Sequence, residues 1–205
     1  MPPVVNEFFD WLKDFSSSPW FYAIVFTIAL LDSILPIVPS ETLVIIGGVA
    51  AGGSGADGSL NIAIVIACGA LGAFVGDNLS YEIARTSAMR RLTRSASGHA
   101  RYEQVVEQIH KRGGLLLITA RFIPGGRTIL TLSCGITGQP RPWFVKWAAI
   151  AATIWATYAA MLGYLGGRTF HDNPTLAFGV AFGTAVSITV VVEAVRWALK
   201  RRASE

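Results

Sequence analysis

The chain has little charge and few residues of the kinds that build catalytic or metal sites. Of its 205 residues only 15% are charged, two are cysteine and three are histidine. There is no HExxH motif and no CxxC pair, so neither a metal site nor a disulfide framework is indicated. No histidine lies in an apolar run, where it would serve as an acid or base. These absences argue against an enzyme, and the sequence predicts no catalytic residue, metal or cofactor.

Long apolar runs, by contrast, dominate the chain. Hydrophobic residues make up 52% of it, and the mean hydropathy is +0.50. Several runs reach the roughly 20 residues that a spanning helix needs; together they cover 20–35, 40–52, 61–84, 115–136, 143–166 and 175–199. The net charge of +4 lies mostly in one loop and the C-terminal tail, where it indicates topology and no nucleic-acid binding. The composition predicts an all-α integral membrane protein.

The run from Leu115 to Thr137 is interrupted in its middle by Arg121-Phe122-Ile123-Pro124-Gly125-Gly126-Arg127. Arginine cannot shed its charge, and at mid-bilayer it costs roughly 2.5 kcal/mol or more. Proline withholds a backbone donor and the two glycines permit a tight reversal, so a continuous helix is not expected. Broken backbone at membrane depth persists only where protein or water covers it. The stretch therefore predicts a re-entrant hairpin over 113–139, with one arginine on each side of its tip.

The run that begins at Trp20 is interrupted in a corresponding way by proline and acid. Asp32 stands inside it, followed by Pro36, Pro39 and Glu41. Two prolines this close block a straight span, and two carboxylates flank them. Residues 20–52 therefore predict a second hairpin, the acidic counterpart of the first.

A spanning helix is predicted over 61–84, where glycines such as Gly76 allow close helix contact. Asp77 and Tyr81 are four residues apart and share a face. Asp77 lies deeper in the predicted helix than Glu82 and Arg85. The charges of Glu82 and Arg85 can be explained by solvation near the helix end. Intramembrane carboxylates are functional by default, so Asp77 is the stronger candidate.

Charge asymmetry predicts the topology. Residues 85–112 carry seven basic side chains against two acidic ones, so this amphipathic segment is expected on the cytoplasmic side. Topology and attraction to anionic lipids explain its charge without a phosphate site. The basic tail of the last segment, 171–205, is also expected in the cytoplasm. An even number of crossings must therefore separate the 85–112 segment from the tail, and helices over 143–166 and 175–199 supply two. A third crossing at 113–139 would make the number odd, which again favours a hairpin there.

Two remaining segments carry weaker signals. Residues 1–19 form a separate N-terminal segment, in which 4–15 predict an amphipathic helix that lies at the interface or packs on the protein's own core. Gly52-Gly53-Ser54-Gly55 matches the GxSG pattern of intramembrane serine proteases, but it falls in a loop without a histidine base. Proteolysis is therefore not predicted.

The order of hairpin, helix, basic segment, hairpin and helix suggests an internal duplication. The arginine motif, followed by Gly135 and Gly163-Tyr164-Leu165-Gly166, resembles the second half of the DedA family, also called the SNARE-associated or VTT-domain family. The first half of the same family is similar to two stretches of this chain: Gly76-Asp77 with Tyr81, and Pro36-Ile37-Val38-Pro39-Ser40-Glu41. The resemblance covers approximately 20–170. Asp32 stands where the family often has Glu, Ser40 where Gly usually precedes the acid, and Ala84 where Gly is common.

The resemblance implies a bacterial inner-membrane protein with two opposed re-entrant hairpins. Together with the apolar runs and the charge asymmetry, the prediction is about three full transmembrane helices, the two hairpins and interfacial amphipathic helices, with the C-terminus cytoplasmic. The resemblance also implies lipid movement between leaflets. Bacterial members are linked to recycling undecaprenyl phosphate and eukaryotic relatives to phospholipid scrambling. Coupling to protons or to a monovalent cation is associated with the family as well. The oligomeric state stays open.

Arg121 and Arg127 are the predicted phosphate contacts, because the guanidinium fork matches phosphate oxygens. Asp32, Glu41 and Asp77 are their predicted partners. A carboxylate displaced by phosphate, desolvated and unpaired, should gain a proton and so couple lipid to proton movement. The hairpin and helix backbone is predicted to depend on a further set: Pro36, Pro39, Pro124, Gly125, Gly126, Gly76 and Tyr81.

Other interpretations are open at this point. The arginines can form buried ion pairs that merely hold the hairpins together. The carboxylates can instead serve a proton-coupled cation antiporter, the chain can act as a general phospholipid scramblase, or it can be a membrane scaffold that transports nothing. Transport is favoured because broken backbone at mid-membrane typically builds transport sites.

Overall fold

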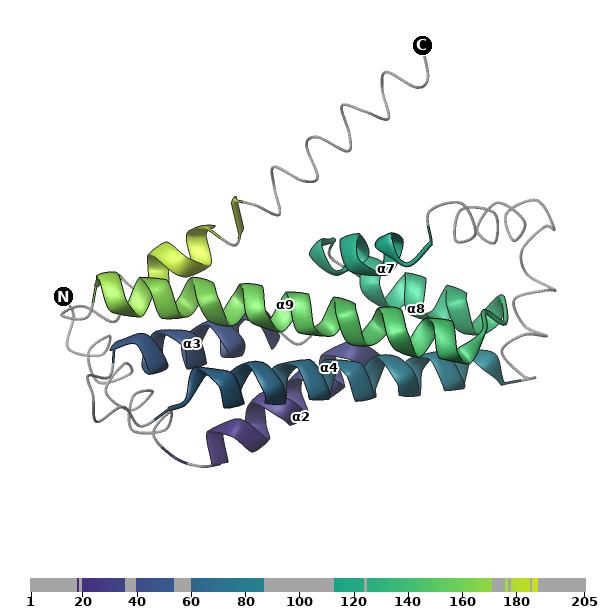
Figure 1. The fold of residues 1–205 in the computed structure, drawn as a ribbon, viewed down its shortest axis with the longest axis horizontal. Coiled ribbons are helices and arrows are strands. Elements are labelled where there is room, and N and C mark those ends of the chain that lie inside the picture. The colour runs from purple at the N-terminus through teal and green to yellow at the C-terminus, as the bar shows by residue number, and fades with distance from the viewer. Residues whose placement is uncertain are drawn as a thin grey trace, which may run out of the picture. The chain divides into compact units, whose positions relative to one another are not determined.

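The computed structural model describes residues 18, 20–35, 40–53, 60–86, 113–123, 125–170, 176, 178–184 and 186–187. Every regular element in these residues is a helix (Figure 1): α2 (Trp20–Ile34), α3 (Ser40–Gly53), α4 (Ile62–Arg85), α7 (Leu115–Thr119), the 3-10 helix η1 (Ala120–Phe122), α8 (Gly126–Ile136) and α9 (Arg141–Thr169). The helices predicted over 61–84 and 143–166 are confirmed as α4 and α9. The predictions for 1–17 and for 87–112 lie outside the described residues.

Two of the described helices, α4 and α9, are long and apolar enough to cross a membrane. Their exposed side chains include large apolar ones suited to lipid, such as Leu71, Ile83 and Leu165. Helices α2 and α3 have 15 and 14 residues, which is about 22 Å of helix against a hydrocarbon core of about 30 Å. The third predicted spanning helix, over 175–199, falls largely outside the described residues.

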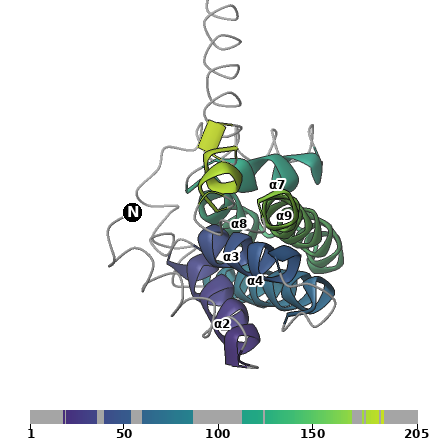
Figure 2. The ribbon, with the colours of Figure 1, turned by 90° about the vertical axis from the view of Figure 1, so that its left-hand side faces the viewer.

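The chain divides into two compact units, and each is described separately. Unit 1 comprises Met1–Thr27, Pro39–Gly69 and Ala156–Glu205. Within it α3 packs against the first part of α2, the start of α4 and the second half of α9 (Figure 2). Gly48 of α3 lies directly against the backbone of α9 at Ala160, so these two helices approach closely.

Unit 2 comprises Ile28–Val38 and Ala70–Trp155. Helices α7 and α8 lie beside the first half of α9 in this unit (Figure 1), and the second half of α4 completes the core. The core residues come from all of these elements: Tyr81, Leu117, Ala120, Leu130, Cys134, Phe144 and Ala148. The packing ties the broken stretch between α7 and α8 to two long helices.

The break predicted between Leu115 and Thr137 is confirmed, and its geometry is a tight turn. The Gly126 N–H donates to the Ile123 carbonyl at 2.9 Å, and Gly125 has φ 70° and ψ −12°. These angles suit the third residue of a type II turn, which favours glycine because φ is positive there. Residues 115–122 and α8 make limbs of about 12 and 16 Å at 1.5 Å per residue, each too short to span a bilayer. Pro124 itself lies outside the described residues.

The helix predicted over 143–166 is longer than predicted, because α9 continues through Gly166 and Gly167 to Thr169. Gly163 lies against the backbone of α3 at Ile45, within unit 1. Its small size permits this close contact between helices. At the other end α9 begins at Arg141, since proline is tolerated in the first turn of a helix and Pro142 does not delay the start.

Tyr81 joins α4 to the connection between α8 and α9. It is fully buried, its hydroxyl donates to the Gln139 carbonyl at 2.6 Å, and its ring stacks on Phe144 at 4.4 Å. Tyr81→Phe keeps the ring and leaves a buried carbonyl unpaired, so we expect a loss of about 1–3 kcal/mol in the free energy of unfolding. Tyr81→Leu should lose more, because the stacked ring is removed as well. Equilibrium unfolding in detergent measures both, and a Tyr81→Phe protein of unchanged stability would contradict the assigned hydrogen bond.

Candidate functional site

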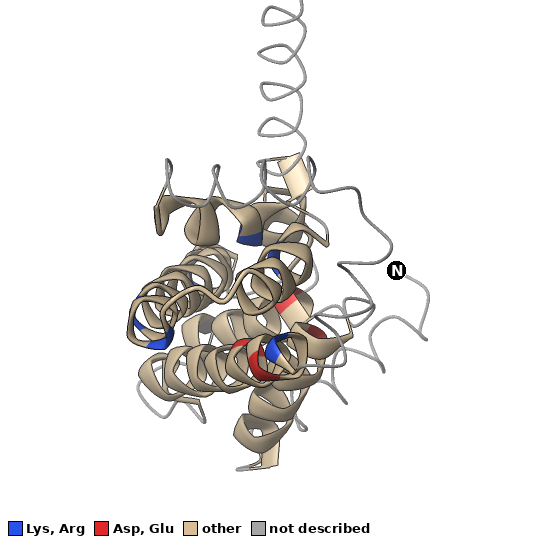
Figure 3. Ribbon diagram, turned by 90° about the vertical axis from the view of Figure 1, so that its right-hand side faces the viewer, with Lys and Arg blue, Asp and Glu red and all other residues tan. Residues whose placement is uncertain are grey.

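Four charged side chains from four helices meet inside unit 2: Asp32 of α2, Asp77 of α4, Arg121 of η1 and Arg127 of α8. We call them the charge cluster. Arg121 donates from Nη2 to Asp77 Oδ2, and Arg127 donates from Nη2 to Asp32 Oδ2 at 3.0 Å. Within the described residues, Lys, Arg, Asp and Glu occupy only a small part of the ribbon (Figure 3).

The two ion pairs of the charge cluster differ in depth. The side chains of Arg121 and Asp77 are 2% and 4% exposed, whereas those of Arg127 and Asp32 are 12% and 17% exposed. Arg127 Nε also lies 3.8 Å from Asp77 Oδ1, close enough for attraction but too far for a hydrogen bond. The cluster therefore has a closed pair and a more accessible pair, with Asp77 between the two arginines.

Small residues bring α2 against α4 at the charge cluster. Ser33, next to Asp32, donates to the Ala73 carbonyl at 3.2 Å, and its own carbonyl accepts from Ser80 at 3.0 Å. A Cβ at Gly76 would lie 2.5 Å from the Leu30 carbonyl oxygen. Gly76, which precedes Asp77, thus permits the contact that places the two aspartates on neighbouring helices.

Trp155 of α9 covers the face of the Arg121 guanidinium, whose central carbon lies 5.9 Å from the ring centroid. Trp155 is 5% exposed, so this cation–π contact is shielded from water. Sequence reasoning did not single out Trp155. A tryptophan in the interior of a spanning helix, away from the interfaces that the residue favours, is the signal that would have found it.

Three polar atoms in this part of unit 2 are buried and have no hydrogen-bond partner among the described residues: Asp77 Oδ1, Arg121 Nη1 and Thr128 Oγ1. Buried polar groups are normally paired, so each of these needs an explanation. Two are on members of the charge cluster, and Thr128 follows Arg127 in α8. Together they give two donors and one acceptor that further polar groups can engage.

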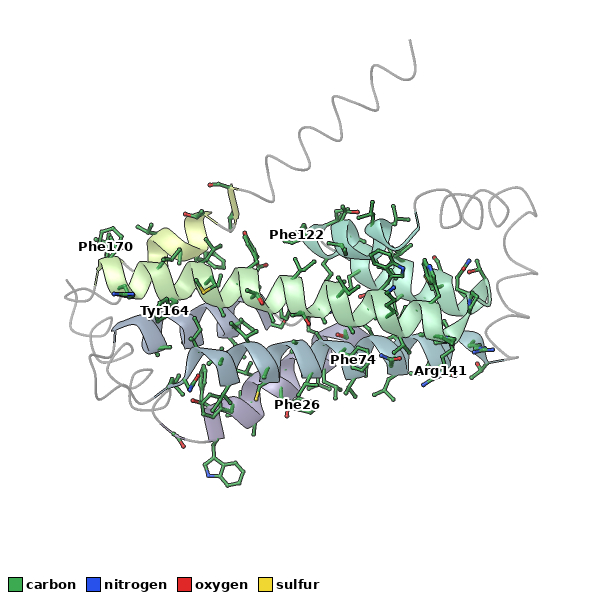
Figure 4. The ribbon with its side chains drawn as sticks, viewed as in Figure 1. Phe26, Phe74, Phe122, Arg141, Tyr164 and Phe170 are labelled. Carbon is green, nitrogen blue, oxygen red and sulfur yellow. The ribbon has the colours of Figure 1, made fainter. Side chains whose placement is uncertain are left out.

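A second pair of charges lies near the ends of α4 and α9, where Glu82 pairs with Arg141 (labelled in Figure 4). Its side chains are 44% and 50% exposed, and such pairs contribute at most about 1 kcal/mol. Arg85 lies over the Tyr81 ring at 5.8 Å from its centroid. Glu82 and Arg85 therefore behave as exposed residues at a helix end, separate from the charge cluster.

The predicted site residues divide into three groups. Arg121, Arg127, Asp32 and Asp77 come together in the charge cluster, and Gly76, Tyr81, Gly125 and Gly126 lie on the elements that build it. Glu41 opens α3 in unit 1, near Tyr158, so its coupling role stays a prediction. Pro36, Pro39 and Pro124 lie outside the described residues. No group of three metal-ligating side chains occurs among the residues that the structure describes.

Comparison with known proteins matches residues 38–165 to the VTT domain family. Inner membrane protein YohD of Escherichia coli (strain K12) is 30% identical over 167 residues, covering 79% of this chain and 83% of the relative. Undecaprenyl phosphate transporter A of Staphylococcus aureus is 26% identical over 195 residues, covering 88% and 92%. Protein DedA of Escherichia coli (strain K12) is 28% identical over 154 residues, covering 72% and 69%. No solved structure matches the chain.

Proposed function

Since the chain belongs to the DedA family of VTT-domain membrane proteins, we propose that it is a lipid translocase that moves undecaprenyl phosphate between the leaflets of a bacterial inner membrane. The observation that carries the proposal is the pair of arginines beside the turn at Gly125, one with a buried side chain and one partly exposed, each held by an aspartate. A relative of similar length is named as an undecaprenyl phosphate transporter, which supports the choice of lipid. In this proposal the limbs on each side of that turn form a re-entrant hairpin, opposed by a hairpin over 20–52, and the C-terminus is cytoplasmic.

A lipid phosphate cannot cross the hydrocarbon core unless something replaces its hydration. Arg127 is the arginine that first receives it, because the Arg127–Asp32 pair is the more accessible of the two. The phosphate exchanges with the Asp32 carboxylate, since a guanidinium binds either anion through the same fork of N–H groups. Only the headgroup passes through the protein, and the polyprenyl tail stays in lipid.

The released aspartate supplies the coupling to protons. A carboxylate that loses its arginine inside a membrane protein is desolvated and unpaired, and it gains a proton. Return of Arg127 to Asp32 after the phosphate leaves releases that proton on the other side. Glu41 is the further carboxylate proposed for this coupling, from its place in the predicted acidic hairpin.

The charge cluster supports an anionic substrate over a bare cation. Both of its carboxylates are paired with arginine, so a monovalent cation would have to compete with a guanidinium for each one. A phosphate, by contrast, brings the negative charge that replaces a carboxylate on the arginine. The cation antiporter is therefore the less favoured alternative.

Leaflet exchange in vesicles containing the purified protein tests the proposal. We expect fluorescent undecaprenyl phosphate to exchange, faster with a pH gradient, and a glycerophospholipid to exchange far more slowly. Arg127→Gln should slow exchange by about 10- to 100-fold, because hydrogen bonds to a charged group contribute about 1.5–3 kcal/mol. Arg141→Gln is the matched control, since it removes an exposed arginine from the same unit.

Each other outcome selects a different function. Equal exchange of both lipids would make the protein a general scramblase. Movement of a monovalent cation in vesicles without undecaprenyl phosphate would favour the antiporter. A protein that moves neither lipid nor cation would be left with a scaffold role, and the proposal would be wrong.

A further inference from the structure

Building on the proposed function, we infer that Thr128, Arg121 Nη1 and Asp77 Oδ1 together recognise a phosphate monoester that keeps one proton, and so distinguish monoesters from phosphodiesters. The observation is the set of three buried polar atoms without a hydrogen-bond partner among the described residues. Thr128 is 8% exposed, and the side chains of Arg121 and Asp77 are 2% and 4% exposed. These three atoms are therefore too deeply buried to form hydrogen bonds with water at the protein surface.

Two of the three atoms are the free ends of one ion pair, and the third is on a residue next to Arg127 in the chain. Arg121 holds Asp77 through Nη2 and Oδ2, which leaves Nη1 and Oδ1 as the other ends of the same ion pair. Asp77 Oδ1 lies 3.8 Å from Arg127 Nε, and Thr128 is the next residue after Arg127 in the first turn of α8. Asp77 Oδ1 thus lies beside the arginine that the proposed function assigns to the headgroup, and the inference places the Thr128 hydroxyl and Arg121 Nη1 at the same headgroup.

Their chemistry matches a phosphate that carries both an ionised oxygen and a hydroxyl. Arg121 Nη1 is only a donor and the Thr128 hydroxyl can donate, so both suit ionised phosphate oxygens. An ionised Asp77 Oδ1 is only an acceptor, and a fully ionised phosphate would repel it. A monoester whose second ionisation falls near pH 6 can instead offer a P–OH to that oxygen. A phosphodiester has no such hydroxyl, so Asp77 Oδ1 would face a like charge.

Thr128 is the specificity-determining residue that this inference adds. A buried hydroxyl without a protein partner costs stability, so its presence needs another reason. Thr128→Val keeps the size of the side chain and removes only the donor. The variant should therefore be as stable as the unaltered protein, or more so, yet slower in transport. If Thr128 were purely structural, the Thr128→Val protein would be less stable and would transport lipid at the original rate.

The test uses two fluorescent lipids with the same polyprenyl chain, one ending in a phosphate monoester and the other in its methyl ester. In vesicles with the unaltered protein, we expect leaflet exchange of the monoester to be at least about tenfold faster, as one lost charged hydrogen bond implies. Thr128→Val should slow monoester exchange about tenfold, with a midpoint of thermal unfolding that is unchanged or higher. Thr128→Ser, which keeps a hydroxyl, should exchange the monoester at close to the original rate.

Thr137→Val provides the matched control, because the Thr137 hydroxyl at the end of α8 already donates to the Ser133 carbonyl at 2.8 Å. Its exchange rate should not change. Equal rates for the two lipids, an unaffected Thr128→Val, or a Thr128→Val protein of lower stability would each overturn the inference while leaving the proposed function standing. If the unaltered protein exchanges neither lipid, the proposed function fails and this inference fails with it.

Discussion

Arg121→Met is expected to lower the free energy of unfolding by about 3–5 kcal/mol, because it leaves the Asp77 carboxylate buried without its hydrogen-bonded partner. Removing Asp77 as well, in Arg121→Met with Asp77→Leu, should restore most of that stability, since an apolar pair of similar volume carries no uncompensated charge. Lipid exchange should be absent from both proteins. Equilibrium unfolding in detergent and leaflet exchange in vesicles measure the two effects on the same preparations.

The control for this pair is Glu82→Gln, which breaks the half-exposed ion pair with Arg141. It should change the free energy of unfolding by less than about 1 kcal/mol, since exposed pairs contribute little. Lipid exchange should be unaffected. A double variant that regained both stability and transport would mean that the buried pair only holds helices together, and the phosphate site would then lie elsewhere.

The restored stability of the double variant would bear on why the charge cluster exists. Buried ion pairs are weak devices for stabilising a fold, because the cost of removing two charges from water often exceeds their attraction. Four charges at a cluster where two side chains are no more than 4% exposed are therefore hard to explain by stability alone. In the proposed function, exchange of one anion for another at the arginines would explain them.

Gly76→Val is expected to abolish lipid exchange and to cost about 1–3 kcal/mol of stability through overpacking. A Cβ at this position would lie 2.5 Å from both the Leu30 carbonyl oxygen and Ser33 Cβ, so α2 has to move away from α4. Asp32 is on α2, one residue from Ser33, and would leave Arg127 with it. Exchange assays and unfolding curves of the variant test this directly.

Gly69→Ala is the control on the same helix. Its added Cβ would meet the Val44 side chain at 3.3 Å, a contact that a small side-chain shift relieves. We expect near-normal stability and exchange from it. A Gly76→Val protein that behaved like Gly69→Ala would show that the contact of α2 with α4 is not needed to hold Asp32 on Arg127.

The break in the arginine stretch could be predicted because local chemistry decides it. Pro124 withholds a donor and Gly125 accepts a positive φ, and these properties hold whatever surrounds them. The positions of α4 and α9 followed from apolar run lengths for a similar reason. Helix ends were less predictable, since Gly166 and Gly167 lie inside α9 and only tertiary contact distinguishes a packing glycine from a terminating one.

The membership of the charge cluster could be predicted, but its pairing could not. Three acids were available to two arginines, and which ones meet depends on how α2, α4 and α8 pack. Asp77 is near both arginines, which come from η1 and α8, while Gly76 and Ser33 bring α2 with Asp32 close beside α4. Thr128 was missed because a hydroxyl side chain in an apolar run carries no signal until its neighbours are known. Trp155 did carry a signal, its place in the interior of a spanning helix, but only its neighbours show what the ring contacts.

The most direct measurement is solid-state NMR on the protein in bilayers, with ¹⁵N in arginine side chains and ³¹P in bound undecaprenyl phosphate. A dipolar contact between the lipid phosphorus and the guanidinium nitrogens is predicted. It should be weaker in Arg127→Gln, where only Arg121 remains to contact the phosphate, and unchanged in Arg141→Gln. Guanidinium nitrogens that show no contact with phosphorus when the lipid is bound would contradict the assignment of these two arginines to the headgroup.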